Sequence, residues 1–171
     1  MKEKKDIRLL KLEDIISFCS SNNQPKFRAK QIWEWLWTKR ATSFNDMTSL
    51  SISFRLLLNN SFVINPIKIH KIIKSLDGTI KYSFKLYDNH LVEGVLIPSK
   101  NRLTACISSQ VGCSLSCKFC ATGTLKLKRN INAAEIYDQV FLLNNEAIQK
   151  FHKPISNIVY MGMGEPLLNY N

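Results

Sequence analysis

The chain has 171 residues, of which 45% are hydrophobic and 22% are charged, so it is long enough for one substantial core or two small domains and does not have the composition of a disordered chain. Lys and Arg total 24 against 13 Asp and Glu, a formal net charge of +11. This charge favours a nucleic-acid partner, because neutralised phosphates release counterions; a generic basic composition is the alternative. No apolar run reaches the length of a membrane span, and residues 1–6 are charged rather than apolar, which predicts a cytoplasmic protein with no membrane attachment.

The first elements in chain order are predicted to be helices. Apolar residues at helical spacing predict an amphipathic helix over about 12–20, and Cys19 on its apolar stripe is interpreted as a small buried hydrophobe. A second helix is predicted over about 27–39. Its three tryptophans, Trp33, Trp35 and Trp37, favour core packing between helices over a base-stacking platform.

The hydrophobic period then changes to that of strands. Alternation over 80–86 predicts a half-buried strand, and the Asp-Gly turn at 77–78 joins it as a hairpin to the segment around 69–76. A third strand is expected over 91–97, where alternation places Glu93 on the same face as apolar neighbours. The pattern leaves two interpretations open: a buried carboxylate, and an edge-strand glutamate turned to solvent.

The C-terminal part combines strands with a helix. A strand over 103–109 leads into a cysteine cluster, and Asn132 with Glu135 resembles a capping box that opens a helix. Residues 158–161 are expected to form a short, apolar strand of the kind that is buried in parallel sheets. Strand, helix and strand make one βαβ unit, so the sequence predicts the α/β class.

Cysteines are concentrated in one place. Four of the five fall between Cys106 and Cys120, with Cys113, Cys117 and Cys120 on one short loop. A cubane cluster has four irons and normally takes four thiolates, so three thiolates leave one iron open for a substrate. Structural zinc needs four closed ligands, no histidine is within a loop's reach, and Cys106 lies seven residues upstream in a strand. We therefore predict an open iron–sulfur site rather than a zinc site or inert thiols.

A glycine and acidic stretch, GMGEP at 162–166, follows the last predicted strand. Its glycines allow a ligand to approach the backbone, and Glu165 can pair with an ammonium group. It is not a dinucleotide-binding fingerprint, because Leu167 stands where the third glycine is needed.

These motifs carry a family resemblance. CSLSCKFC at 113–120 resembles the Cys-x3-Cys-x-aromatic-Cys signature of radical S-adenosylmethionine enzymes, with Phe119 in the aromatic place, and the GMGEP stretch is similar to the part of that superfamily that receives the methionine amino group. The chain further resembles the RlmN family of ribosomal and transfer RNA adenine methyltransferases in six segments: PKFRAKQI at 25–32, SFNDMT at 43–48, DGT at 77–79, EGVLIP at 93–98, CISSQVGC at 106–113 and MGMGEPLLN at 161–169. The sister Cfr family shares much of this pattern.

The resemblance implies methylation of carbon 2 of adenine in 23S rRNA and tRNA, with a 4Fe-4S cluster and S-adenosylmethionine as cofactors. In the family, one S-adenosylmethionine methylates a cysteine near the C-terminus, and a second is cleaved to a radical that activates this methyl group. A flavodoxin-type electron donor and a monomeric state are expected. Methylation at carbon 8, as in the Cfr family, is the alternative.

Carried over residue by residue, the resemblance places the cluster on Cys113, Cys117 and Cys120, and S-adenosylmethionine on Gly164 and Glu165.

Two further residues are implied to be catalytic. Glu93 matches the family's proton acceptor, which favours the buried interpretation of its carboxylate, and Cys106 matches the cysteine that pairs with the methylated one. The division of the proton step between them is left open. Basic side chains of the N-terminal helices are expected to contact RNA phosphates, with a solvated basic face as the alternative: Lys26, Arg28, Lys30, Lys39 and Arg40.

The expected domains are a helical, RNA-contacting accessory domain over 1–62, an antiparallel β connector over 63–101, and the first βαβ unit of a radical S-adenosylmethionine (β/α) barrel over 102–171. A complete barrel needs more strand–helix units, and a methyl-accepting cysteine is expected after Cys120, where this chain has none. We therefore expect a truncated chain that is inactive alone. Two hypotheses stand for such a chain: a methyltransferase whose sequence is incomplete here, and a truncated, non-catalytic remnant that still binds RNA or a cluster.

Overall fold

The computed structural model describes residues 4–115 and 117–170. Residues 1–3 of the charged start, Ser116 of the cysteine motif and Asn171 lie outside the described residues. The chain divides into two compact units, Met1–Asn65 and Pro66–Asn171. Within the described part of the chain, no helix is long and apolar enough to cross a membrane.

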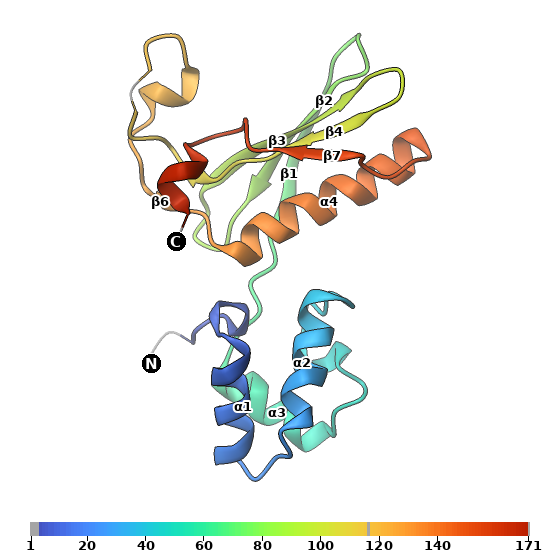
Figure 1. Cartoon of the computed structure of the whole chain (residues 1–171), viewed down its shortest axis with the longest axis vertical. Coiled ribbons are helices and arrows are strands. Elements are labelled where there is room, and N and C mark those ends of the chain that lie inside the picture. Colours follow the sequence, from blue (N-terminus) through green and yellow to red (C-terminus); the bar gives the residue numbers. More distant parts are fainter. Residues whose placement is uncertain (1–3, 116, 171) are drawn as a thin grey trace. The chain divides into compact units, whose positions relative to one another are not determined.

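The first unit is built from helices (Figure 1). Its α-helices are α1 (Leu12–Ser21), α2 (Phe27–Trp37) and α3 (Ile52–Ser61). The structure confirms the two predicted helices, whereas α3 has no counterpart in the predictions. Ser51 caps α3, because its hydroxyl accepts a hydrogen bond from the backbone N–H of Phe54 at 3.3 Å.

The three helices share one apolar core. Cys19 is fully buried in it, as predicted. Trp33, Trp35 and Trp37 are half-buried against the same core, which confirms that they pack between helices. Trp35 also satisfies its indole N–H, which donates to the Ser49 hydroxyl at 2.8 Å.

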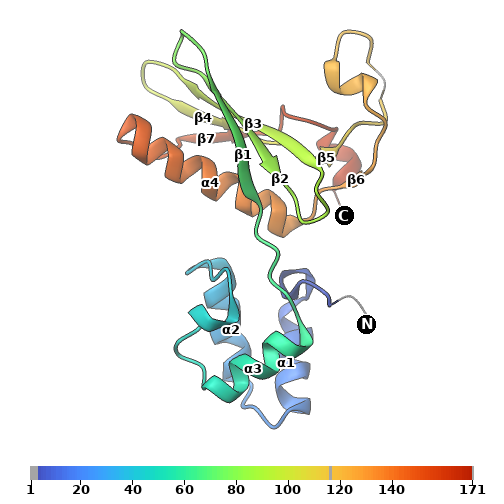
Figure 2. The same cartoon turned by 180° about the vertical axis from the view of Figure 1, so that it is seen from behind.

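The second unit contains a five-stranded sheet in the order β1-β2-β3-β4-β7 (Figures 1 and 2). Its strands are β1 (Lys68–Lys74), β2 (Ile80–Lys85), β3 (Leu91–Pro98), β4 (Leu103–Cys106) and β7 (Asn157–Val159). The first four pair antiparallel, and β7 pairs parallel to β4 after the chain crosses through α4 (Ala133–Phe151). The structure thus confirms the α/β class, the hairpin at the Asp-Gly turn and the βαβ unit.

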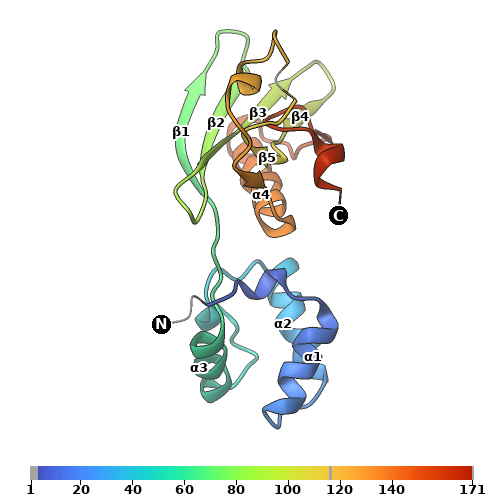
Figure 3. The same ribbon diagram turned by 90° about the vertical axis from the view of Figure 1, so that its left-hand side faces the viewer.

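Helix α4 covers one face of this sheet (Figure 3). Apolar side chains of β2 and β3 meet it there, and Tyr82, Phe84 and Leu143 are fully buried. Burying an apolar side chain of this size contributes roughly 1.5–3 kcal/mol. The predicted capping box is confirmed: the Asn132 side chain accepts from the Glu135 N–H at 3.0 Å, and the Glu135 carboxylate accepts from the Asn132 N–H at 3.1 Å.

The last strand is exposed, as expected for a parallel edge without a further strand beside it, although its apolar run is typical of buried strands. β7 lies at the edge of the sheet, and Ile158 is 44% exposed, Tyr160 45% and Met161 80%. The strand pairs with β4 on one side only, so its apolar residues lack a second neighbour. An apolar run predicts a strand, but burial depends on elements stacked beside it.

Candidate functional site

The candidate site lies at the carboxyl ends of the two parallel strands. The chain leaves β4 at Cys106 and continues through residues 107–111 into residues 112–128, which we call the cysteine loop. It leaves β7 into residues 160–166, which we call the glycine loop. Because β4 and β7 are parallel neighbours, both loops emerge at the same edge of the sheet. In α/β folds, this edge is where ligands bind.

The glycine loop packs directly on the segment that follows β4. The Gly162 N–H donates to the Ile107 carbonyl at 3.0 Å. A Cβ on Gly162 would lie 2.7 Å from that carbonyl oxygen, and a Cβ on Gly164, whose φ is +95°, would lie 2.5 Å from the Cβ of Gln110. The sequence interpretation assigned these glycines to ligand approach. In the structure, they first of all allow two segments of the same chain to approach each other.

Ser108 joins three elements beneath the glycine loop. Its hydroxyl donates to the Glu93 carbonyl at 2.6 Å and accepts from the Met163 N–H at 2.8 Å. Gln139 of α4 clamps the Ser108 backbone: its side-chain oxygen accepts from the Ser108 N–H at 2.9 Å, and its amide donates to the Ser108 carbonyl at 3.1 Å. Ser108 and Gln139 are fully buried, so losing either partner would leave an unsatisfied polar group.

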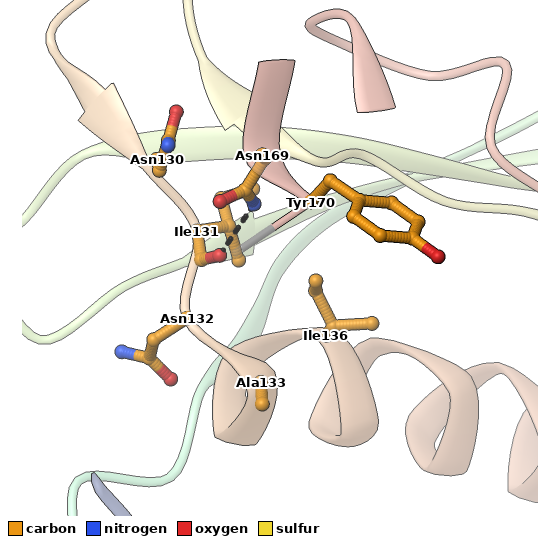
Figure 4. A pocket seen from close by; sticks show the side chains of 7 residues that line it. All are labelled: Asn130, Ile131, Asn132, Ala133, Ile136, Asn169 and Tyr170. Atoms are coloured by element: carbon orange, nitrogen blue, oxygen red, sulfur yellow. Dashed lines mark hydrogen bonds between the residues drawn. The ribbon is translucent and has the colours of Figure 1, made fainter. Parts of the chain in front are cut away.

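Gln110 and Asn169 complete this support. The Gln110 side-chain oxygen accepts from the Glu165 N–H at 3.0 Å. The Asn169 amide donates to the Ile131 carbonyl at 2.8 Å (Figure 4) and to the Ser109 carbonyl, also at 2.8 Å. The Glu165 carboxylate accepts from the Leu167 N–H at 3.0 Å, which ties this side chain to its own turn.

Sequence reasoning assigned no role to Ser108, Gln110, Gln139 or Asn169. Two signals pointed to the first three of them: a polar run, Ser-Ser-Gln at 108–110, inside an otherwise apolar segment, and Gln139 next to the apolar stripe of the predicted helix.

Two cavities share Ile136, Asn169 and Tyr170 in their linings, and one of them is also lined by the glycine loop. One, of about 460 Å³, opens at the N-terminal turn of α4, where Asn130 and Asn132 also line it (Figure 4). The other, of about 430 Å³, has a further lining of Ser109, Tyr160, Pro166 and Leu167. Both have the size of small-molecule sites, which are about 300–1,000 Å³.

The neck of the cysteine loop is closed by a two-stranded sheet of β5 (Gln110–Val111) and β6 (Arg129–Asn130). Cys113, Cys117 and Cys120 are half-buried and in no disulfide. Among residues 4–115 and 117–170, no group of three or more His, Cys, Asp or Glu side chains could hold a metal ion. The three thiols therefore lie on one loop, but in this structure they are not arranged as a set of metal ligands. Phe119 is 95% exposed.

The donor chemistry of the loop nevertheless fits an iron–sulfur cluster. Residues 112–128 contain three cysteines and three lysines, and no Asp, Glu or His. Soft thiolates select iron–sulfur clusters or zinc. Because the loop offers no histidine or carboxylate, it cannot complete a four-ligand zinc site from its own side chains. Its lysines favour an anionic, thiolate-bound group.

Arg129 anchors the end of the cysteine loop. Its guanidinium donates to both carboxylate oxygens of Glu135 at 2.8 Å, and its Nε donates to Asp88 at 2.6 Å. The hydrogen bond to Glu135 is the main reason that the pKa of Arg129 is raised. Burial alone would raise the pKa of Asp88, but hydrogen bonds from Arg129 and His90 outweigh it and hold that pKa well below its ordinary value. The loop is thus tied to α4 and to the β2–β3 turn.

Glu93 and Cys106 lie on the sheet face that α4 does not cover. The β3–β4 register pairs Val95 with Cys106, and Glu93 precedes Val95 by two residues, so both side chains point to that face. Cys106 is 6% exposed. Its burial raises the pKa of the thiol, and a hydrogen bond from the Met161 backbone acts against this.

The expectation of a buried Glu93 carboxylate is wrong. Its side chain is 46% exposed, and one carboxylate oxygen lies 2.7 Å from Nζ of Lys81. The carboxylate therefore keeps contact with water.

The predicted phosphate contacts of the first unit differ in their surroundings. Arg28 donates to Gln31 and to the Ser49 carbonyl, and Lys39 pairs with Glu34 at 3.1 Å. Lys26 and Lys30 are exposed.

Parallel strands that carry a cysteine loop and a glycine loop are the features of a radical S-adenosylmethionine fold. The structure is similar to the crystal structure of a radical SAM methyltransferase from Sphaerobacter thermophilus, with a TM-score of 0.79 and 35% sequence identity, over 97% of this chain and 49% of that one. The fold is therefore α/β, with part of the architecture of that class.

Sequence comparison then gives the family. Residues 6–64 match the model of the ribosomal RNA large subunit methyltransferase N-terminal domain. The probable dual-specificity RNA methyltransferase RlmN of Cytophaga hutchinsonii is 55% identical over 98% of this chain and 46% of its own length. The dual-specificity RNA methyltransferase RlmN of Geotalea uraniireducens is 46% identical over 98% of this chain and 47% of its own length. The chain belongs to the RlmN family and spans about half the length of these relatives.

Proposed function

We propose that this protein is a radical S-adenosylmethionine methyltransferase that methylates carbon 2 of adenine in 23S rRNA and tRNA. One observation carries the proposal: the cysteine loop and the glycine loop leave neighbouring parallel strands at one edge of the sheet. The relatives named dual-specificity RNA methyltransferases support the substrate class. We place the enzyme in the cytoplasm, where its proposed substrates are. We further propose that it is a monomer.

Cys113, Cys117 and Cys120 would hold a 4Fe-4S cluster, which, when bound and reduced by a flavodoxin-type donor, supplies the electron that cleaves S-adenosylmethionine. Gly164 and Glu165 would bind the methionine end of that cofactor. One oxygen of the Glu165 carboxylate accepts from the Leu167 N–H, so the side chain is fixed by its own turn and keeps a second oxygen for an ammonium group.

Glu93 and Cys106 would handle the proton that leaves the adenine. Because burial raises the pKa of the Cys106 thiol, this residue keeps its proton at neutral pH. The Glu93 carboxylate, which is paired with Lys81, is the oxygen base on this face of the sheet. We therefore assign proton acceptance to Glu93 and sulfur chemistry to Cys106.

Anaerobic reconstitution of the full-length protein tests the proposal. We expect four irons per chain, a brown colour and a spectrum that changes when S-adenosylmethionine is added. Colourless protein with stoichiometric zinc would contradict the cluster. Mass spectrometry of digested RNA then reads the position of the methyl group: 2-methyladenosine supports the proposal, and 8-methyladenosine or unmodified adenosine contradicts it.

A further inference from the structure

The sheet face that α4 leaves uncovered carries four lysines on the neighbouring strands β1 and β2, of which one, Lys81, is paired with Glu93. The β1–β2 register pairs Lys68 with Lys85 and Lys71 with Ser83. The opposite side of β2 is taken by its buried apolar residues, so alternation points these lysines to the uncovered face. We call Lys68, Lys71 and Lys85 the lysine strip. All three are exposed, and none forms an ion pair within the described part of the chain.

The strip is electrostatically unfavourable by itself. Lys68 and Lys85 stand directly opposite each other, and like charges in that position destabilise an antiparallel pair. Lys71 adds a third positive charge on the same face. Glu93 is the one acidic residue in the described strands, and it is paired with Lys81 at 2.7 Å. Within the sheet, nothing offsets the charge of the strip, whereas a bound polyanion would.

The strip is close to the proposed catalytic residues. Strand β2 pairs with β3 on its other side, and its Ser83 stands opposite Glu93. Neighbouring strands are about 4.8 Å apart, so the strip and Glu93 are separated by one to two strand widths on a single face. A phosphate backbone held by the strip therefore brings a nucleotide to the side of the sheet where Glu93 and Cys106 point.

We propose that the lysine strip binds phosphates of the RNA substrate and forms an RNA surface on the sheet, additional to the contacts expected of the first unit. The inference takes the RNA from the proposed function and adds where its backbone runs. Lysine side chains contact phosphates as point charges and read no bases. The strip therefore contributes affinity and placement, and the choice of adenine is made elsewhere.

Fluorescence anisotropy of the full-length protein with a labelled RNA stem-loop, over a range of salt concentrations, tests this surface. The strip variant is K68Q/K71Q/K85Q. The control, K74Q/K100Q/K153Q, removes the same charge at lysines off the strip: Lys74 pairs with Ile80 on the α4 side, and the other two lie outside the strands. We expect the strip variant alone to lose affinity about tenfold and its salt slope to fall by about 2, at about 0.7 per single-stranded phosphate.

An unchanged salt slope in the strip variant, or an equal loss in both variants, overturns the inference. Binding of the unaltered protein to anionic phospholipid vesicles but not to RNA overturns it as well. RNA methylation by the unaltered protein is measured in parallel. If the unaltered protein methylates RNA and the strip variant still binds RNA fully, the RNA surface on the strip is refuted and the proposed function stands. If the unaltered protein does not methylate RNA, the proposed function is refuted. A selective binding loss in the strip variant supports the surface in either case. Circular dichroism of all variants checks that they fold.

Discussion

Cys106 of β4 and Glu93 of β3 point to the same face of the sheet, yet their surroundings differ sharply. Cys106 is 6% exposed, whereas the side chain of Glu93 is 46% exposed and paired with Lys81. The Cys106 thiol is therefore shielded from water by the protein interior, whereas the Glu93 carboxylate is in contact with water. Substitution and chemical modification should separate the two residues.

Replacing Glu93 by Gln should leave stability nearly unchanged and abolish RNA methylation. An exposed ion pair such as Lys81–Glu93 contributes at most about 1 kcal/mol, whereas the amide cannot accept the proton. Urea denaturation and methylation assays check the two halves of this prediction. Lys81→Gln is the matched control for the lost ion pair. Full methylation by the Glu93 variant would exclude Glu93 as the proton acceptor.

Alkylation should distinguish Cys106 from the cysteines of the loop. Burial raises the pKa of the Cys106 thiol, and the thiolate is the reactive form, so its modification needs a higher pH as well as an opening of the sheet. In cluster-free protein at neutral pH, we expect iodoacetamide to label Cys113, Cys117 and Cys120 before Cys106. Peptide mass spectrometry measures the order, and buried Cys19 provides the internal control. Equal labelling rates would show that the β4 edge is open.

Removing one thiol of the cysteine loop should remove the cluster. Cys117→Ala leaves two thiolates, too few to hold a cubane cluster, so we expect iron content close to zero after anaerobic reconstitution. Cys19→Ala, in the core of the first unit, is the control and should bind as much iron as the unaltered protein. Iron retained at four per chain in Cys117→Ala would remove this residue from the ligand set.

Gly164→Ala should displace the glycine loop. The residue has φ +95°, which costs roughly 1–2 kcal/mol for an L side chain, and the added Cβ would lie 2.5 Å from the Cβ of Gln110. Overpacking adds about 1–3 kcal/mol. We expect a lower melting temperature and weaker S-adenosylmethionine binding by calorimetry. Gly78→Ala shares the positive φ, +85°, and should lose stability without losing cofactor affinity.

Asp88→Asn should destabilise the protein in a pH-dependent way. The folded-state pKa of Asp88 lies below its unfolded value of about 3.9, so the ionised carboxylate stabilises the fold above that pH. This stabilisation is lost as the pH falls through the folded-state pKa. With charged hydrogen bonds worth about 1.5–3 kcal/mol, the variant should be that much less stable at pH 7 and nearly equal in acid. Urea titrations across the pH range measure this, and a constant difference would contradict it.

Local sequence patterns predicted the elements of this protein because such patterns act within a few residues. The capping box of Asn132 and Glu135, the alternation of β2 and the Asp-Gly turn all formed as expected. The short loop that carries Cys113, Cys117 and Cys120 was also evident, since three residues in eight positions cannot be far apart.

Relationships between distant segments were not predictable in this way. Arg129 binds Asp88 across a separation of 41 residues, and the fit of Gly164 on Gln110 depends on which segment lies beneath the glycine loop. The exposure of Glu93 and Ile158 depends on what is stacked beside their strands, which periodicity does not contain.

The sequence by itself determined the family, the α/β class, the cysteine loop and most helices and strands, but not α3 or the short strands β5 and β6 at the neck of the loop. Only the tertiary structure decided that Cys106 is buried while Glu93 is half-exposed, that the glycines seat one loop on another, and that three lysines share a face with the proposed catalytic residues. The reason is physical: short-range patterns fix the local conformation, whereas burial and charge environment are set by the neighbours that folding brings together.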